Sequence, residues 1–321
     1  MGCKNVMVYV ETAEGKPVNV GLEMLTAAKD IAEKVTAVVI GADAASAAAT
    51  AISYGADAAI TVDAAEYNTE AYAVIIEALA KKYAPEMVFV GGTTNGKDLG
   101  ARVAAKLKAG CVTDVIGIKE ADGKVVLTAP LYGGSIYSDA VVDGSVAVAI
   151  VRGGVFKKAE PEEGKQGEVT AETVEVAELK AKIVNAVQEI SESVNLEEAE
   201  IIVAGGRGMG SAENFELVKE LADLLGGVVG ATRPAMEDGW VSRAHQVGQS
   251  GKIVAPKLYI AAGISGAIQH VSGMIGSDYI VAINKDEDAS IFDVANVGIV
   301  GNAIDALKIM IEEVKKMKAD E

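Results

Sequence analysis

The stretch Leu258-Tyr259-Ile260-Ala261-Ala262-Gly263-Ile264-Ser265-Gly266-Ala267-Ile268-Gln269-His270 indicates how the second half of the chain folds. Its first five residues are apolar, which is typical of a short strand buried in a parallel sheet. Gly263 and Gly266 then predict a tight turn, and a helix is expected to start over 267–275. A strand, a glycine turn and a helix in this order direct backbone N–H groups at an anion, and the helix dipole adds roughly half a positive charge. The stretch therefore predicts an anion-binding turn in an α/β fold.

The residues of this turn have both a functional and a structural interpretation. Gly266 has no Cβ, so a ligand could approach its backbone, and Ser265 could donate its hydroxyl to the same anion. Gln269 and His270 follow within the first helical turn, near enough to touch the same ligand. However, many glycine turns at strand ends bind nothing, and a histidine at a helix start often has only a structural role. From the turn alone, both interpretations stay open.

The composition limits the class of protein. The chain has 321 residues, of which 50% are hydrophobic and 4% aromatic; this length is enough for two domains, and the small residues suit α/β layers. A formal net charge of −17 argues against nucleic acid and anionic lipid as partners, because both require a basic surface. Two cysteines, Cys3 and Cys111, are too few for a disulfide framework, and Cys111 is expected to be buried. Without a signal-peptide pattern or an apolar run of membrane-spanning length, we expect a soluble cytoplasmic protein with no membrane insertion.

The first half of the chain alternates strands and helices. Expected strands lie at 6–10, 35–40, 58–62 and 87–90, and expected helices at 20–34, 44–54, 70–83 and 99–108, with a polar glycine turn at 91–98. This order predicts a parallel, Rossmann-like sheet. The strand-like segments after residue 111, at 115–118, 125–129, 135–141 and 146–151, predict an antiparallel extension of that sheet. A last strand at 173–176 and a helix at 181–191 complete a domain over 1–190.

A second domain is expected over 191–321, again α/β and doubly wound. Its predicted strands lie at 201–204, 227–231, 258–262 and 279–283, and its predicted helices include 213–225 and 303–317. Ligands of such open sheets bind outside the carboxyl ends of the strands. The segments that follow those ends are Gly205–Ser211, Thr232–Arg233, Gly263–His270 and Asn284. The sequence therefore predicts one binding site along this edge.

Several common motifs are absent from the sequence. The loop Gly205–Ser211 has serine where the dinucleotide fingerprint needs its last glycine, and Gln249–Lys252 lacks the flanking residues of a phosphate-binding Walker loop. Two histidines, His245 and His270, without a cysteine pair do not suggest a metal cluster, and no G-x-S-x-G nucleophile elbow occurs. The candidate binding groups that remain are cationic and neutral polar side chains near the glycine turns.

Two arginines and a glutamine-rich loop supply these groups. Arg207 and Arg233 follow strand ends and could pair with a diphosphate or an electron-rich ring, although a surface ion pair is the usual role of a single exposed arginine. Gln246, Gln249 and Ser250 carry donors and acceptors that suit the edge of a heterocycle. Two arginines on strand-end loops of one small domain favour the functional interpretation.

These blocks resemble a known family. The segments 246–252, 258–261, 263–270 and 281–286 closely resemble the signature of the electron-transfer flavoprotein alpha subunit, and 205–208 and 230–233 are similar to further blocks of the family. The resemblance is tight over 200–302 and looser over the first domain. It implies an FAD-binding second domain and a heterodimer with an electron-transfer flavoprotein beta subunit.

The resemblance also implies roles for particular residues. Arg207 would lie by the diphosphate or ribityl region, Arg233 against the isoalloxazine ring, and Asn284 with Asn302 at the adenosine end. His270 would lie near the pyrimidine O2 and Ser250 near N5. Thr232 stands where serine is usual and Asn302 where aspartate is usual, which leaves the contact at 302 open. The complete set expected to bind FAD is Arg207, Thr232, Arg233, Gln246, Val247, Gly248, Gln249, Ser250, Gly263, Ile264, Ser265, Gly266, Ala267, Ile268, Gln269, His270, Asn284 and Asn302.

The implied function is electron transfer without a general base or a covalent intermediate. A subunit of this kind would pass electrons between dehydrogenases, such as acyl-CoA dehydrogenases or similar flavoenzymes, and a further redox partner, either alone or within an NADH-dependent electron-bifurcating complex. A fixed cation at Arg233 would favour a negatively charged reduced flavin. The alternative is an NAD- or nucleotide-binding enzyme or regulatory module on a doubly wound fold. An enzyme of that kind would place an acidic residue on the ribose, about 20 residues after the first glycine loop; Glu220 and Asp223 fall near that range but inside a predicted helix, not at a strand end.

Overall fold

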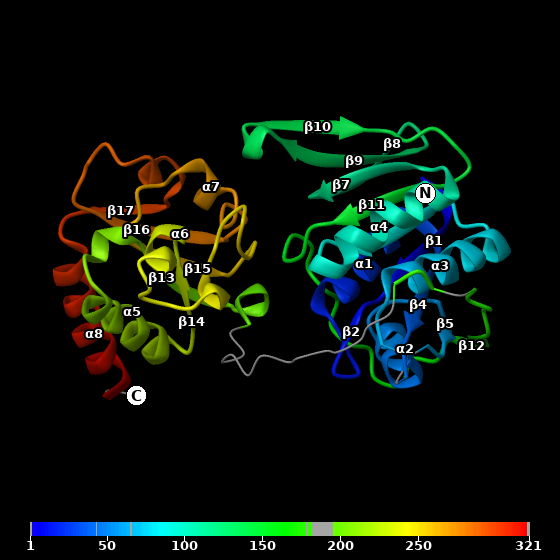
Figure 1. Ribbon diagram of the computed structural model, residues 1–321, viewed down its shortest axis with the longest axis horizontal. Helices are drawn as coiled ribbons and strands as arrows, with labels where there is room; N and C mark the ends of the chain where they lie inside the picture. The colour runs from blue at the N-terminus through cyan, green and yellow to red at the C-terminus, as the bar shows by residue number, and fades with distance from the viewer. Residues whose placement is uncertain (1, 43, 65, 178, 182–194, 320–321) are drawn as a thin grey trace. The chain divides into compact units, whose positions relative to one another are not determined.

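The computed structural model describes residues 2–42, 44–64, 66–177, 179–181 and 195–319. The chain divides into two compact units, Met1–Ala186 and Val187–Glu321. The predicted domain boundary between 190 and 191 falls outside the described residues, as does the predicted helix 181–191 apart from its first residue. Each unit is an α/β fold with a parallel sheet flanked by helices, so the predicted fold class is confirmed (Figure 1).

The first unit is built on a seven-stranded sheet. Its strands are β1 (Cys3–Tyr9), β4 (Ala32–Ile40), β5 (Ala58–Val62), β6 (Met87–Gly91), β7 (Gly110–Val115), β11 (Ala147–Val151) and β12 (Glu168–Glu172). Their order is β12-β5-β4-β1-β6-β11-β7, and every pairing is parallel. The chain leaves β1 toward β4 and later returns to β6 on the other side, so the direction of winding reverses between β1 and β6. Ligands of doubly wound sheets bind at such a reversal.

Helices cover both faces of this sheet. They are α1 (Asn19–Lys29), α2 (Ala44–Ser53), α3 (Thr69–Tyr83) and α4 (Thr94–Leu107). Successive residues of β1 point to opposite faces, so Val6 and Val8 pack in the core with α1 and α2, while Met7 and Tyr9 pack in the core with α3 and α4. Burial on both faces explains why β5, β6 and β11 consist almost entirely of small and apolar residues.

The predicted bounds of a helix, a turn and a strand in the first half differ from the structure. The predicted helix 20–34 ends at Lys29, and residues from Ala32 onward form β4, because Cys3 pairs with Ala32 and draws this segment into the sheet. The predicted turn 91–98 is largely the start of α4, which Thr93 caps by accepting a hydrogen bond from the Gly96 N–H. The last strand was predicted at 173–176, but it is β12 at 168–172. Residues 168–172 are the ones that pair with β5.

The antiparallel strands do not extend the main sheet. β8 (Gly117–Ala121), β9 (Lys124–Leu131) and β10 (Ile136–Ala140) form a separate three-stranded antiparallel sheet. The segment 146–151 was predicted to be part of the antiparallel extension, but residues 147–151 form β11 inside the parallel sheet, because their burial on both faces suits a central parallel strand. Cys111 is exposed rather than buried, because β7 is an edge strand. A short hairpin, β2 (Thr12–Ala13) with β3 (Lys16–Pro17), follows β1.

The second unit has a five-stranded parallel sheet. Its strands are β13 (Ile201–Gly205), β14 (Val228–Ala231), β15 (Leu258–Ala262), β16 (Tyr279–Asn284) and β17 (Val297–Val300), in the order β14-β13-β15-β16-β17. The helices α5 (Ala212–Leu225) and α8 (Ala303–Ala319) share one hydrophobic core with one face of the sheet. Tyr259 and Met274 belong to the core on the opposite face. Its other helices among the described residues are α6 (Arg233–Glu237), α7 (Ile268–Val271) and the 3₁₀ turns η2 (Leu196–Glu198), η3 (Arg207–Met209), η4 (Arg243–His245) and η5 (Ser290–Val294), while the 3₁₀ turn η1 (Tyr132–Gly134) lies in the first unit.

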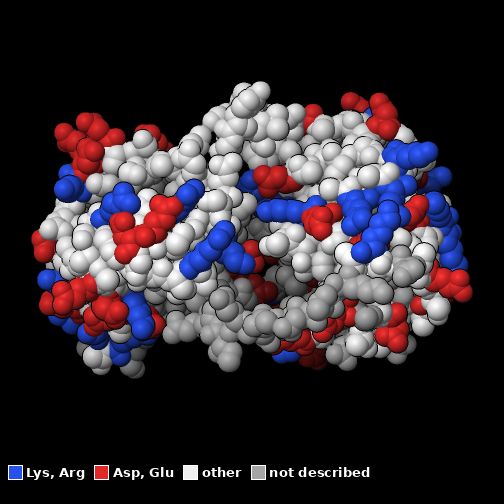
Figure 2. All heavy atoms as spheres, viewed as in Figure 1, with Lys and Arg blue, Asp and Glu red and all other residues white. Residues whose placement is uncertain are grey.

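Acidic and basic side chains are mixed on the face shown in Figure 2. Within the described ranges, no helix is long and apolar enough to cross a membrane.

Candidate functional site

The predicted loops meet at one edge of the second sheet. Gly205 is in register with Ala231 on one side and with Ala262 on the other, and Ala262 is in register with Ile283. Because the strands are parallel, the segments that follow them leave the sheet at the same edge. This edge carries η3 after β13, Thr232 and α6 after β14, the 263–267 turn after β15 and Asn284 at the end of β16. The structure thus brings together the segments that the sequence predicted to form one site.

Three glycines hold two of these loops in direct backbone contact. The Gly208 N–H donates to the Gly263 carbonyl at 3.0 Å. A Cβ added at Gly206 would come within 2.3 Å of the Gly263 oxygen, and one added at Gly208 would come within 2.6 Å. Neither distance is compatible with a side chain, so glycine is required at 206 and 208 for the loops to pack.

Gly266 has a structural role that the sequence did not indicate. Its φ is +88°, and an added Cβ would lie 2.1 Å from the backbone N of Ile291 in η5. The Ile291 N–H donates to the Ser265 carbonyl at 3.1 Å. Gly266 is therefore required for packing against η5, whether or not a ligand approaches the turn.

The turn presents backbone donors, but the helix behind it is short. The N–H groups of Ser265, Gly266 and Ala267 have no acceptor in the part of the chain that the structure describes. The helix predicted over 267–275 is reduced to the four residues of α7, followed by turns. Gly273 lies within the predicted helix and disfavours its continuation, because glycine has a low helix propensity; it packs directly on the backbone of Gly248. The donors are thus individual N–H groups, with little contribution from a helix dipole.

The loop 246–252 is attached to both β14 and α7. The Val247 N–H donates to the Ala231 carbonyl at 2.9 Å, and the Gln249 N–H donates to the Gln269 carbonyl at 2.7 Å. Gln246 is 3% exposed, and its Nε2 donates to the Ser250 hydroxyl at 3.0 Å. Gln249 and Ser250 themselves are exposed. The loop therefore has a fixed backbone and exposes Gln249 and Ser250, whose hydroxyl is held by Gln246.

His270 is buried and fully bonded within the chain. It is 6% exposed; its Nδ1 lies 3.1 Å from the Val247 carbonyl and its Nε2 lies 3.0 Å from the Tyr259 hydroxyl. A carbonyl only accepts, so Nδ1 carries the proton and Nε2 accepts from Tyr259. Burial lowers the pKa of His270 from 6.5 to about 4. At neutral pH the side chain is an uncharged imidazole that links loop 246–252 to β15.

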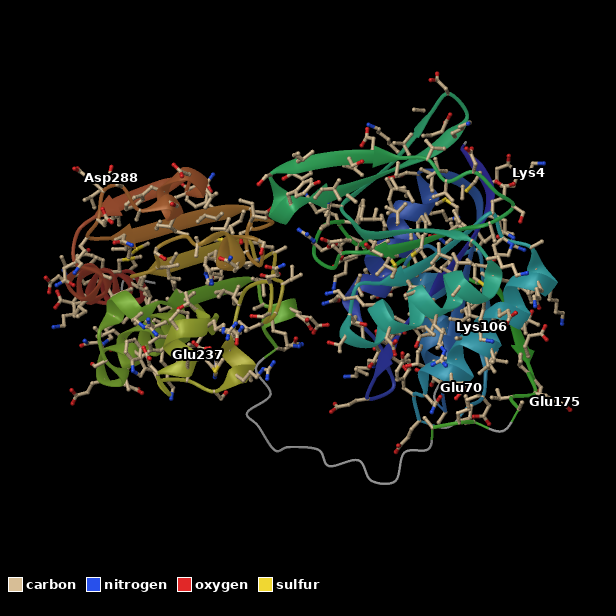
Figure 3. The ribbon with its side chains drawn as sticks, turned by 45° about the horizontal axis from the view of Figure 1, so that its top comes forward. Lys4, Glu70, Lys106, Glu175, Glu237 and Asp288 are labelled. Atoms are coloured by element: carbon tan, nitrogen blue, oxygen red, sulfur yellow. The ribbon has the colours of Figure 1, made fainter. Side chains whose placement is uncertain are left out.

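Both arginines are exposed and paired with carboxylates. The Arg207 Nε lies 2.9 Å from Asp238 Oδ2, and the Arg233 Nε lies 2.8 Å from Glu237 Oε1, with arginine side chains 62% and 64% exposed. Glu237 is labelled on the second unit in Figure 3. Because these pairs are solvated, each contributes little to stability, and the cations remain available to an anion.

The three other polar residues of the set differ in their bonding. The Asn284 Nδ2 donates to the Ile264 carbonyl at 2.8 Å, and the Asn302 Oδ1 accepts from the Ile304 N–H at 2.9 Å, at the start of α8. Asparagine and aspartate cap helices about equally well, so this contact tolerates asparagine at 302. The Thr232 hydroxyl is buried and has no hydrogen-bond partner among the described residues. A buried hydroxyl left without a partner is costly unless something else supplies one.

Sequence reasoning missed Tyr259, Asp238, Glu237 and the packing role of η5. Only the pairing of Arg233 with Glu237 had a visible signal, namely opposite charges four residues apart. The apolar position of Tyr259 in a strand gave no indication that its hydroxyl bonds a distant histidine. The groups of this edge that can still bind a ligand include the unpartnered Thr232 hydroxyl, the three N–H donors of the 265–267 turn and the two exposed arginines. This donor set fits an anionic group that carries a heterocycle, such as FAD.

Comparison with known proteins gives the same assignment. Residues 6–179 match the family described as Electron transfer flavoprotein domain. Residues 195–275 match the family described as Electron transfer flavoprotein FAD-binding domain. The class of protein is therefore a two-domain flavoprotein of electron transfer, and its cofactor is FAD.

Full-length relatives specify the subunit. The chain is 43% identical to the electron transfer flavoprotein subunit alpha of Thermoanaerobacterium thermosaccharolyticum, over 98% of this chain and 99% of the relative. It is 42% identical to the subunit alpha of Megasphaera elsdenii, over 98% and 97% of the two chains. It is also 41% identical to Protein FixB of Clostridium saccharobutylicum, again over 98% and 97%. The chain belongs to the electron transfer flavoprotein alpha subunit family.

Proposed function

We propose that the chain pairs with an electron transfer flavoprotein beta subunit and holds one FAD along the carboxyl edge of its second sheet. When bound, FAD supplies the electron-accepting and electron-donating chemistry. The chain's own contribution is to bind and orient the cofactor and to set the charge around it. The observation that carries this assignment is the Thr232 hydroxyl, which is buried and has no partner among the described residues, at the same edge of the sheet as the free N–H groups of the 265–267 turn.

Each part of the edge has a proposed task. The N–H groups of Ser265, Gly266 and Ala267 donate to phosphate or ribityl oxygens, and Arg207 neutralises the diphosphate. Arg233 lies against the isoalloxazine ring, where its cation favours the reduced, negatively charged form. The rest of the predicted set, from Gln246 to Ser250 and from Ile268 to His270 together with Gly263, Ile264, Asn284 and Asn302, lines or supports the site.

His270 acts on the FAD site indirectly, by holding neighbouring residues in place. Both of its ring nitrogens are bonded to other residues of the chain, so a contact of His270 with the flavin requires exchange of the Tyr259 or Val247 bond. Until that exchange occurs, His270 fixes the position of loop 246–252, which carries Gln249 and Ser250.

The assignment is tested with the heterodimer, co-expressed and purified with its flavin. Arg233→Ala should weaken FAD binding by about tenfold, as expected for a lost charge-assisted contact. Lys257→Ala is the matched control, because Lys257 is also an exposed cation paired with a carboxylate, Glu200, at 2.9 Å, but it precedes β15 at the opposite edge. If the Arg233→Ala and Lys257→Ala heterodimers bind FAD equally well, Arg233 does not contact the cofactor. Thr232→Val should also weaken binding, and an unchanged affinity would leave the orphaned hydroxyl unexplained.

For the electron donor, we propose a class of enzyme rather than a particular protein. We expect the heterodimer to accept electrons from a flavin-dependent dehydrogenase, such as an acyl-CoA dehydrogenase, and to act in the cytoplasm. Reduction by such a dehydrogenase and its substrate, followed in the visible flavin absorption, would support this role. Reduction by NADH alone would support membership of an electron-bifurcating complex. A heterodimer that stays colourless after FAD is added would favour a nucleotide-binding module instead.

A further inference from the structure

A cavity of about 410 Å³ lies in the first unit. It is lined by residues that follow the carboxyl ends of β1, β4, β5 and β6, among them Glu11, Gly41, Glu66 and Asn95. Between β1 and β6 the winding of the sheet reverses, which is where doubly wound folds bind ligands. The cavity therefore has the position of a ligand site in a unit to which no ligand has been assigned above.

A fixed carboxylate lies in this cavity. Glu11 Oε2 accepts from the Thr93 hydroxyl at 2.5 Å, and Glu11 Oε1 accepts from the Asn95 Nδ2 at 3.0 Å. Glu14 and Glu66 add two further carboxylates to the lining. Among the described residues no lysine or arginine lines the cavity, and none forms an ion pair with Glu11. The cavity is thus negatively charged and unsuited to a phosphate or a carboxylate ligand.

Tyrosine rings form the wall beside Glu11. The rings of Tyr67 and Tyr72 meet edge to face with centroids 5.0 Å apart, and those of Tyr9 and Tyr72 with centroids 6.4 Å apart. Tyr9 is 2% exposed, yet its hydroxyl has no hydrogen-bond partner in the described part of the chain. Burial and the nearby Glu11 raise the pKa of Tyr9 well above its usual value, so its hydroxyl stays protonated and available to a ligand.

The chemistry of the lining distinguishes between possible ligands. Aromatic rings and a carboxylate together attract an organic ammonium group through cation–π and ionic contacts. A metal ion is a weaker candidate, because no three carboxylate, histidine or cysteine side chains among the described residues come close enough to hold one. The volume suits a small molecule rather than a dinucleotide.

We propose that the cavity at the carboxyl ends of β1, β4 and β5 binds a small alkylammonium compound of the diamine or polyamine class. One ammonium group contacts the Glu11 carboxylate and the tyrosine rings, and the Tyr9 hydroxyl supplies a further polar contact. Glu14 and Glu66 attract the remaining positive charge. This site is independent of the FAD site, since it is formed only by residues of the first unit.

The proposal is tested by titration calorimetry on the FAD-loaded heterodimer, with putrescine and spermidine as probes and inorganic phosphate and AMP as competitors. Glu11→Gln should weaken amine binding by about tenfold or more, because it removes the central charge but keeps the side-chain shape. Tyr9→Phe should weaken it by a smaller factor, since only the hydroxyl is lost. Both variants should keep their FAD content, which separates failure of this site from failure of the flavin site.

The matched control is Glu33→Gln, an equal change of charge at an exposed position near the amino end of β4. It should leave amine affinity unchanged. Equal weakening by Glu11→Gln and Glu33→Gln would mean that the amines respond only to net charge, and the proposal would fall. It would also fall if neither amine produced binding heat, or if phosphate or AMP competed for the cavity.

Discussion

Acid should destabilise the second unit through one histidine. The pKa of His270 is about 4 in the folded chain and near 6.5 when the chain is unfolded. A group whose folded pKa is lowered contributes its full stability above the unfolded pKa and loses that contribution as the pH falls toward the folded pKa. At about 1.4 kcal/mol for each pKa unit, this difference is worth about 3 kcal/mol of unfolding free energy, lost between pH 6.5 and pH 4.

The assay follows urea unfolding of the FAD-free chain by tryptophan fluorescence at several pH values. The chain contains a single tryptophan, Trp240, whose ring lies 6.2 Å from that of Phe215 in the second unit, so the signal reports that unit. His270→Asn removes the titrating ring and keeps an amide donor for the Val247 carbonyl. Carboxylates titrate in both proteins, so the informative quantity is the difference between them.

Wild type should lose about 3 kcal/mol more than His270→Asn between pH 7 and pH 4. His245→Asn is the matched control, because His245 is only half buried and bonds a different carbonyl, that of Val229 at 2.8 Å. This control should keep the pH dependence of the wild type. If wild type and His270→Asn show parallel pH profiles, the neutral, buried imidazole cannot be the origin of the acid sensitivity.

Three substitutions test the packing directly. Tyr259→Phe should lower the unfolding free energy by about 1–3 kcal/mol, because His270 Nε2 loses its donor in a buried position, and the Trp240 assay measures the change. Gly266→Ala should lower the melting temperature of the second unit, since the new Cβ would lie 2.1 Å from the Ile291 N at a positive φ; an unchanged melting temperature would contradict the contact with η5. Phe89→Ala should cost about 3–5 kcal/mol in the first unit, measured by circular dichroism, while the Trp240 transition stays in place.

Much of the second unit was predictable from the sequence. The strand 258–262 was predicted with its observed bounds, because a short apolar run between Lys257 and a glycine turn has few other conformations in an α/β fold. The clustering of Gly205–Ser211, Thr232 and Asn284 at one edge followed from the parallel direction of the strands. These features depend on local pattern and on topology, both of which the sequence carries.

Other features depend on contacts between distant segments. The end of α1 was missed because pairing with β1 decides which apolar residues near Ala32 join the sheet. The helix after Gly266 proved short, and Gly273 within the predicted helix packs against Gly248, a contact between loops that no spacing rule describes. The same holds for the bond from Tyr259 to His270, whose partners lie on a strand and a helix. Such contacts are known only once the loops are placed in three dimensions.

The glycine contact between η3 and the turn after β15 has an evolutionary consequence. At positions 206, 208 and 263 the two backbones touch, and every substitution adds volume at the same point. A second mutation elsewhere in the trio therefore cannot compensate for the first. We expect these three positions to remain glycine in distant homologues even where the residues facing the cofactor diverge. They would then mark descent from this architecture more durably than the arginines do, since an exposed cation can be replaced from a neighbouring position.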